Sequence, residues 1–270
     1  MTVDACKAIG IIDSGVGGLT VAQEIYRQLP RESTVFFGDT ARFPYGSRSP
    51  EEVRRYVLEI IDFLESQEIK LLVVACNSAT AAGLSHYQER CSIPVVGVIE
   101  PGVRAALAYT RNRRIGVIGT VGTINSSAYE RTLKRYDPSI TVISKACPLF
   151  VLLVENDLID TPEAELVARE YLSPFQEADI DTLILGCTHY PLMSDLIQSV
   201  VGPGVKLVSS AQETAREVKE ILTRRNLLYP LEDNKPSHRF FVSGKASFFQ
   251  EIGTRIAGFP IKPYQVLLDS

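Results

Sequence analysis

The chain has 270 residues, of which 45% are hydrophobic and 22% charged, so it can form one or two globular domains with a substantial core. Its 28 basic and 32 acidic residues give a net charge of −4, which excludes the basic surface typical of nucleic-acid-binding proteins. No apolar run approaches the roughly 20 residues that span a bilayer, and the start of the chain lacks the pattern of a signal peptide. We therefore expect a cytoplasmic protein that binds neither nucleic acid nor membrane.

Strand-like and helix-like segments alternate along the chain. Aliphatic runs predict strands at 8–13, 34–38, 70–75, 95–98, 115–119, 141–145, 182–186 and 206–209. Amphipathic stretches predict helices that include 18–28, 50–67, 162–177 and 211–225. This alternation predicts an α/β fold of parallel sheets covered by helices.

The chain also repeats itself. IGIIDS at 9–14 resembles IGVIGT at 115–120, an offset of 115 − 9 = 106, and two cysteine segments are offset by 187 − 76 = 111. We read this as two pseudo-symmetric lobes, each a mainly parallel sheet covered by helices. The expected lobes are 1–99 with 210–270, and 100–209, since the tail after 238 carries a strand and a helix that return to the first lobe. Such a fold predicts an active site in the cleft between the lobes.

The two cysteine segments are the sharpest chemical signal. LLVVACNS at 71–78 and TLILGCTH at 182–189 each end a predicted strand with a cysteine, Cys76 or Cys187. Ligands bind at the carboxyl ends of parallel strands. A free cysteine is usually a small buried apolar residue, but a helix that begins beside it lowers the pKa of its thiol. Two thiols from two lobes can remove a proton from one face of a carbon and return it on the other.

A glycine-rich turn, DSGVGG at 13–18, follows the first predicted strand. It lacks the third glycine of a dinucleotide fingerprint and the Gly-Lys-Ser/Thr of a phosphate-binding P-loop. Its backbone N–H groups suit a carboxylate as well as a phosphate. Asp13 either caps the following helix or faces a ligand.

Further polar groups follow other predicted strands. The turn at 44–46 exposes the backbone of Tyr45 and Gly46, and a second glycine-rich turn carries Thr120 and Thr123. Glu155 ends an apolar stretch and matters only if it folds back over the second thiol. The three histidines and five cysteines form no close ligand pairs, so we expect neither metal nor disulfide.

These motifs, in this order, resemble glutamate racemases of the aspartate/glutamate racemase family. The residues that carry the resemblance are DSGVGG at 13–18, PYG at 44–46, VACNSA at 74–79, GT at 119–120 and LGCTHYP at 185–191. The resemblance implies a cofactor-independent enzyme that interconverts L- and D-glutamate by a two-base mechanism and supplies D-glutamate for peptidoglycan. It implies glutamate as the partner molecule, and it allows a homodimer.

The resemblance also implies roles for individual residues. Cys76 acts as the base toward the D-enantiomer with help from Asp13, and Cys187 acts toward the L-enantiomer with help from His189 and Glu155. The substrate is held by Asp13, Ser14, Tyr45, Gly46, Asn77, Ser78, Thr120, Thr123, Thr188 and His189. Ser78 stands where threonine is usual, and Leu152 stands where proline is frequent, which leaves the position of Glu155 open.

Three other functions compete with this interpretation. A racemase of the same family could act on aspartate or a hydantoin, since the size of the pocket decides between these substrates. A two-lobed protein that only binds a small anion would not need two thiols. A hydrolase with a cysteine nucleophile would need one thiol with a histidine, and it would leave the second thiol unexplained.

Overall fold

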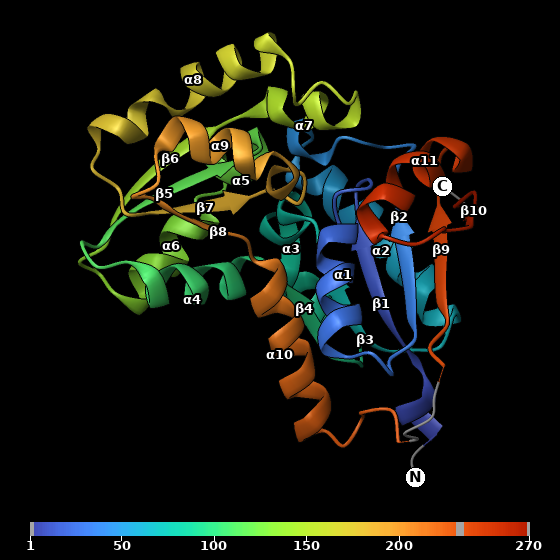
Figure 1. Ribbon diagram of the computed structural model, residues 1–270. Helices are drawn as coiled ribbons and strands as arrows, with labels where there is room; N and C mark the ends of the chain where they lie inside the picture. The colour runs from blue at the N-terminus through green and yellow to red at the C-terminus, as the bar shows by residue number, and fades with distance from the viewer. Residues whose placement is uncertain (1–2, 231–234, 269–270) are drawn as a thin grey trace.

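A computed structural model describes residues 3–230 and 235–268, and its strands form two wholly parallel sheets (Figure 1). The first sheet has the order β10-β9-β2-β1-β3-β4 and the second has the order β6-β5-β7-β8. Their bounds are β1 Ala8–Asp13, β2 Thr34–Gly38, β3 Ile69–Val74, β4 Val95–Gly97, β5 Arg114–Gly119, β6 Thr141–Ala146, β7 Thr182–Gly186, β8 Lys206–Val208, β9 His238–Val242 and β10 Pro263–Gln265. The predicted α/β class is confirmed.

Helices lie on the faces of both sheets. Their bounds are α1 Leu19–Gln28, α2 Pro50–Ser66, α3 Asn77–Arg90, α4 Ile99–Tyr109, α5 Val121–Asn125, α6 Ala128–Tyr136, α7 Pro148–Glu155, α8 Pro162–Glu177, α9 Ser194–Val201, α10 Ala211–Arg224 and α11 Ala246–Ala257. Three short 3-10 helices are η1 Val3–Cys6, η2 Tyr45–Ser47 and η3 Tyr190–Met193. Within the described ranges, no helix is both long and apolar enough to cross a membrane.

The two sheets share one topology. Strands β2-β1-β3-β4 and β6-β5-β7-β8 occur in the same spatial order, and β9 and β10 extend the first sheet beside β2. The loose sequence repeat therefore corresponds to a structural repeat. Three parts of the expected first lobe lie outside the described residues: 1–2, 231–234 and 269–270. The first of them begins the segment in which we expected no signal peptide.

The strands are continuous aliphatic runs because both of their faces are covered. Every residue of β1, β2, β3 and β7 is buried.

The helix α2 begins with a capping box, in which the Ser49 hydroxyl accepts from the Glu52 N–H and the Glu52 carboxylate accepts from the Ser49 N–H. The helix α10 leaves the second sheet after β8 and packs beside α1 of the first sheet (Figure 1).

Candidate active site

The glycine-rich turn after β1 encloses a buried carboxylate. Asp13 ends β1, and its Oδ2 accepts from the backbone N–H groups of Gly15 (3.2 Å) and Gly18 (2.9 Å). A Cβ at Gly18 would lie 2.4 Å from the Asp13 Cβ, so this approach requires glycine. Burial raises the pKa of Asp13, although His189 and the two N–H groups oppose the rise. The turn therefore presents an acid at the carboxyl edge of the first sheet.

Cys76 follows β3, the neighbour of β1, and is the N-cap of α3. Its sulfur accepts from the Ala79 N–H at 3.5 Å and lies 3.8 Å from the Ser14 hydroxyl. The Ala79 N–H at the helix start lowers the pKa of this thiol, as we expected, but other effects outweigh it and the pKa is raised overall. Burial raises its pKa to about 12, and the Asp13 carboxylate adds to the rise, because the single N–H and the hydroxyl compensate for only part of the lost hydration.

Cys187 follows β7, the equivalent strand of the second sheet, but no α-helix begins beside it. The chain turns through η3, and α9 starts only at Ser194, so the expectation of a helix start at this cysteine is wrong. The partner of Cys187 is instead a histidine. The Cys187 sulfur lies 3.8 Å from Nδ1 of His189, and Nε2 of His189 lies 2.6 Å from Oε1 of Glu155. Glu155 ends α7 and reaches the second thiol only through His189.

His189 is held in its charged form by this arrangement. Burial alone would lower its pKa, but the Cys187 sulfur and the Glu155 carboxylate outweigh burial and raise the pKa to about 10. An imidazolium beside a thiol stabilises the thiolate. The two cysteines therefore have opposite electrostatic surroundings, with an acid near Cys76 and a cation near Cys187.

Hydroxyl groups from both halves of the molecule meet next to Cys76. Ser78 Oγ lies 2.8 Å from Thr120 Oγ1 and 3.4 Å from Thr123 Oγ1, which belong to the turn after β5. The backbone of Gly46 packs on Thr120, since a Cβ there would lie 2.5 Å from the Thr120 Cβ. These groups can donate hydrogen bonds to a carboxylate once they turn away from one another.

The two halves are closed on each other. Thr188 Oγ1 donates to Asp13 Oδ1 at 3.4 Å, and a Cβ at Gly17 would lie 2.5 Å from Thr188 Oγ1 and 2.6 Å from His189 Nδ1. The predicted residues that are buried are Asp13, Ser14, Tyr45, Gly46, Cys76, Asn77, Ser78, Thr120, Thr123, Cys187, Thr188 and His189. The Glu155 side chain keeps 9% of its surface exposed. The structure thus brings the predicted residues together where the two halves of the molecule meet.

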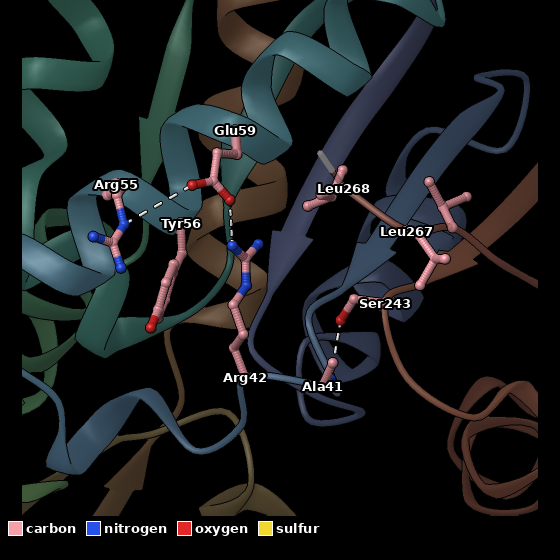
Figure 2. A pocket seen from close by; sticks show the side chains of 9 residues that line it. Ala41, Arg42, Arg55, Tyr56, Glu59, Ser243, Leu267 and Leu268 are labelled. Atoms are coloured by element: carbon pink, nitrogen blue, oxygen red, sulfur yellow. Dashed lines mark hydrogen bonds and ion pairs between the residues drawn. The ribbon is translucent and has the colours of Figure 1, made fainter. Parts of the chain in front are cut away.

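The turn at 44–46 is anchored by a hydrogen bond of the Tyr45 side chain. The Tyr45 hydroxyl donates to Oδ2 of the buried Asp39, which also accepts from Arg42 Nε (2.7 Å) and Ser243 Oγ (2.6 Å). Figure 2 shows the outer side of this network, where Arg42 pairs with Glu59 and the Ala41 N–H donates to Ser243. The Tyr45 side chain is therefore structural, which leaves its backbone and that of Gly46 for a ligand.

Three further residues contribute to the site, although we did not predict them from the sequence. Asp39 anchors the turn just described. The ring of Phe43 packs 5.8 Å from the ring of His189, and Phe43 thereby covers the second half of the site. The Tyr129 hydroxyl donates to Asn77 Oδ1 at 2.6 Å. Asp39 and Phe43 lie in a loop that the motifs mark, but nothing in the sequence distinguishes Tyr129 from an ordinary core residue of its helix.

Comparison with known proteins identifies the class to which this site belongs. The profile of the Asp/Glu/Hydantoin racemase family matches residues 9–218. The chain belongs to this family of racemases.

Individual relatives extend the match over the whole chain. The glutamate racemase of Geobacter metallireducens is 55% identical over 98% of both chains. The crystal structure of a glutamate racemase from Bacillus anthracis superposes with a TM-score of 0.93 at 50% identity, over 97% of this chain and 98% of that one. A glutamate racemase from Francisella tularensis in complex with D-glutamate gives a TM-score of 0.91 at 36% identity, over 98% and 99%. The resemblance to glutamate racemases predicted from the motifs is confirmed.

Proposed function

We propose that this protein interconverts L- and D-glutamate without a cofactor, with Cys76 and Cys187 as the two proton-transferring groups. The observation that carries the proposal is the pair of buried thiols at equivalent strand ends of two facing sheets, each with its own ionisable partner. The thiols interact electrostatically, since charge on Cys187 contributes to the raised pKa of Cys76. An enzyme with one nucleophilic thiol would not need this duplication.

The reaction consists of two proton transfers on opposite faces of the α-carbon. One thiolate forms an S–H bond as the Cα–H bond breaks, and the released electron pair delocalises into the substrate carboxylate. The opposite thiol then donates its proton to the other face, so the enzyme ends with thiol and thiolate exchanged. Cys187 would be the base toward L-glutamate and Cys76 the base toward D-glutamate.

The surroundings of each thiol suit a weakly acidic substrate. An α-proton needs a strong base, and a thiolate that has lost its hydration shell in a closed site is a stronger base than one in water. Asp13 would assist Cys76, while His189, held by Glu155, would assist Cys187. Donors from Ser14, Asn77, Ser78, Thr120, Thr123 and Thr188 would stabilise the charge that develops on the carboxylate, together with the backbone of Tyr45 and Gly46.

Glutamate is the substrate best supported. The relatives matched over the full chain are glutamate racemases, and two of the matched crystal structures carry D-glutamate and L-glutamate. The matched aspartate racemase and aspartate racemase homologue are only 17% and 18% identical, so they share the fold alone. Production of D-glutamate would supply peptidoglycan synthesis.

The lobe bounds, the compartment and the oligomeric state belong to the same proposal. We infer lobes of 1–99 with 210–270 and 100–209, hinged where α4 and α10 begin. A cytoplasmic location agrees with the free thiols of all five cysteines, which need a reducing compartment. A homodimer, allowed by the family resemblance, is testable by sedimentation.

One experiment tests the activity directly. The purified protein is incubated with L-glutamate in deuterated water without added cofactor, and optical rotation and α-deuteration are followed together. We expect rotation to decay to zero while deuterium enters the α-position. Stable rotation without deuterium uptake would refute the proposal, and faster turnover of aspartate than of glutamate would reassign the substrate.

A further inference from the structure

A single tyrosine of the second half connects the two cysteine turns. Tyr129 lies in α6, is 2% exposed, and donates its hydroxyl proton to Asn77 Oδ1 at 2.6 Å. Asn77 directly follows Cys76. On the other side, a Cβ at Gly186 would lie 3.0 Å from Tyr129 Cε2, and Gly186 directly precedes Cys187. One side chain therefore touches a neighbour of each thiol.

The hydroxyl bond determines which end of the Asn77 amide faces the cleft. Burial raises the pKa of Tyr129 above its ordinary value, so the hydroxyl stays protonated and acts as a donor to Asn77. Only the amide oxygen can accept this proton, which leaves Nδ2 as the free end. Asn77 is 2% exposed, and its Nδ2 has no hydrogen-bond partner among residues 3–230 and 235–268. An unpartnered buried donor is costly unless a ligand satisfies it.

The same hydroxyl lies where the chain passes between the sheets. A Cβ at Gly102, in α4, would lie 3.4 Å from the Tyr129 hydroxyl and 3.3 Å from the Cβ of Ser210, the residue before α10. The two connections between the sheets therefore meet at Gly102, and the Tyr129 hydroxyl lies beside this meeting point. Opening the cleft would have to change the Tyr129–Asn77 contact, because the two residues belong to different halves.

We propose that Tyr129 is a positioning residue for the reaction: in the closed state it orients the Asn77 amide so that Nδ2 donates to a carboxylate oxygen of the substrate. The proposal rests on the proposed racemase function, for which the substrate is an amino-acid carboxylate. Tyr129 touches no reacting atom and acts only through Asn77 and through the packing of Gly186.

The test is a double-mutant cycle between Tyr129→Phe and Asn77→Ala, with KM and kcat measured for L-glutamate. A net hydrogen bond contributes about 0.5–1.5 kcal/mol, so we expect Tyr129→Phe to raise KM by about 2- to 13-fold, with a smaller change in kcat. Because Tyr129 acts through Asn77, we expect the double variant to match Asn77→Ala alone. An unchanged KM in Tyr129→Phe, or effects that simply multiply, would overturn the proposal.

A matched control separates positioning from general stability. Tyr87 is likewise buried, and its hydroxyl donates to the Ala79 carbonyl of α3 at 3.3 Å, away from Asn77. We expect Tyr87→Phe to lower the melting temperature about as much as Tyr129→Phe while KM stays at the wild-type value. An equal rise of KM in both variants would show that the Tyr129 effect is merely structural.

Asn77→Asp keeps the proposal testable if Tyr129→Phe folds poorly. The aspartate can still accept from Tyr129, but it replaces the free N–H donor by an oxygen that repels a carboxylate. We expect KM to rise more than in Asn77→Ala, and an unchanged KM would overturn the proposal. Wild-type turnover is measured alongside, since an inactive wild type refutes the proposed function itself, whereas normal wild-type turnover with insensitive variants refutes only the role of Tyr129.

Discussion

The turn after β3 and the turn after β7 occupy the same place in two sheets of the same topology, yet different ionisable groups surround their thiols. Cys76 caps a 14-residue helix and lies near the buried acid Asp13. Cys187 precedes a 3-10 turn and contacts His189, which Glu155 holds. The repeat thus preserves the position of the thiol but not its chemical surroundings.

This difference follows from the task that each thiol would perform. A racemase must bind two mirror-related α-carbons in one asymmetric cleft, so the groups on its two faces need not match. The Asp13 anion adds to the raised pKa of Cys76 and so makes its thiolate a stronger base, whereas the neighbour of Cys187 is the cationic His189. The comparison predicts that damage to either turn stops racemisation but leaves different partial activities.

The largest expected effect comes from removing one thiol. We expect Cys76→Ala and Cys187→Ala each to lower the racemisation rate by about 10³-fold or more, since general acid–base groups contribute about 10²–10⁴-fold each. The remaining base can still exchange a proton on its own face. Cys187→Ala should therefore exchange deuterium only into D-glutamate, and Cys76→Ala only into L-glutamate, as mass spectrometry of the unreacted enantiomer would show.

If each variant instead exchanged deuterium into the other enantiomer, the roles assigned to the two cysteines would have to be reversed. Exchange into both enantiomers by one variant would mean that a single base reaches both faces. Either result would break the comparison between the two turns.

The next largest effect concerns the partner of each thiol. We expect Asp13→Asn and His189→Asn to lower kcat by about 10- to 10³-fold, since each weakens one of the two proton transfers. Weakening the step at Cys187 makes removal of the L-side proton rate-limiting. His189→Asn should therefore increase the kinetic isotope effect on α-deuterated L-glutamate and decrease it on the D-enantiomer, and Asp13→Asn should do the opposite.

Equal isotope effects in both directions for both variants would show that the two partners are not specific to one thiol. The value of kcat/KM must in any case stay equal in both directions, because the two enantiomers have the same free energy. That equality serves as an internal check on the kinetic data.

Much of this arrangement was predictable from the sequence, because buried parallel strands leave a strong aliphatic pattern. The strands β1, β2 and β7 have the predicted bounds, β4, β5, β6 and β8 differ by one residue at one end, and β3 is shifted by one residue at both ends. The bounds of β9 were not predicted, and β10 was not predicted at all. The site motifs were also recognisable, since they lie in turns directly after these strands. Glu155 was uncertain because its position depends on the end of α7 and not on a strand.

The electrostatics of the two thiols could not be predicted in this way. A helix start after Cys76 is visible in the sequence, but the pKa depends on burial and on Asp13, which come from the closed three-dimensional cleft. Tyr129 has no motif, because its significance comes from contacts with residues 52 and 57 positions away in the chain. Local patterns identify the groups of a site, whereas their charge states depend on distant parts of the fold.

A smaller effect is expected from a change that separates the two turns without removing a functional group. A methyl group at Gly17 would collide with Thr188 and His189 across the cleft, so Gly17→Ala should prevent full closure. A misplacement of about 1 Å can cost up to about 10²-fold, and we expect kcat/KM to fall by about 10- to 100-fold. Gly204→Ala is the control, because its added methyl group would have no described residue within 4 Å apart from its neighbours in the chain.

Steady-state kinetics and thermal unfolding of both variants provide the measurement. Gly17→Ala should retain nearly the wild-type melting temperature, since the collision is between the halves and not within one core. Wild-type activity in Gly17→Ala would mean that turnover does not require this degree of closure.

The smallest expected effect is on stability and concerns only the second turn. His189 has a pKa of about 10 in the folded protein against about 6.5 when unfolded, so the folded state retains a proton that the unfolded state loses between these pH values. The free energy of unfolding should therefore decrease as the pH rises through this window, by at most about 1.4 kcal/mol per pH unit. In Glu155→Gln the carboxylate no longer raises the pKa of His189, so this pKa should fall. The variant should therefore lose less stability than the wild type between pH 7 and 9.

Urea unfolding at both pH values measures this difference, with Glu165→Gln as the exposed control that makes the same change in charge. Equal pH dependence in the wild type and in both variants would show that the Glu155 carboxylate does not hold the proton on His189, and the charge of His189 in the second turn would then depend on its contact with Cys187.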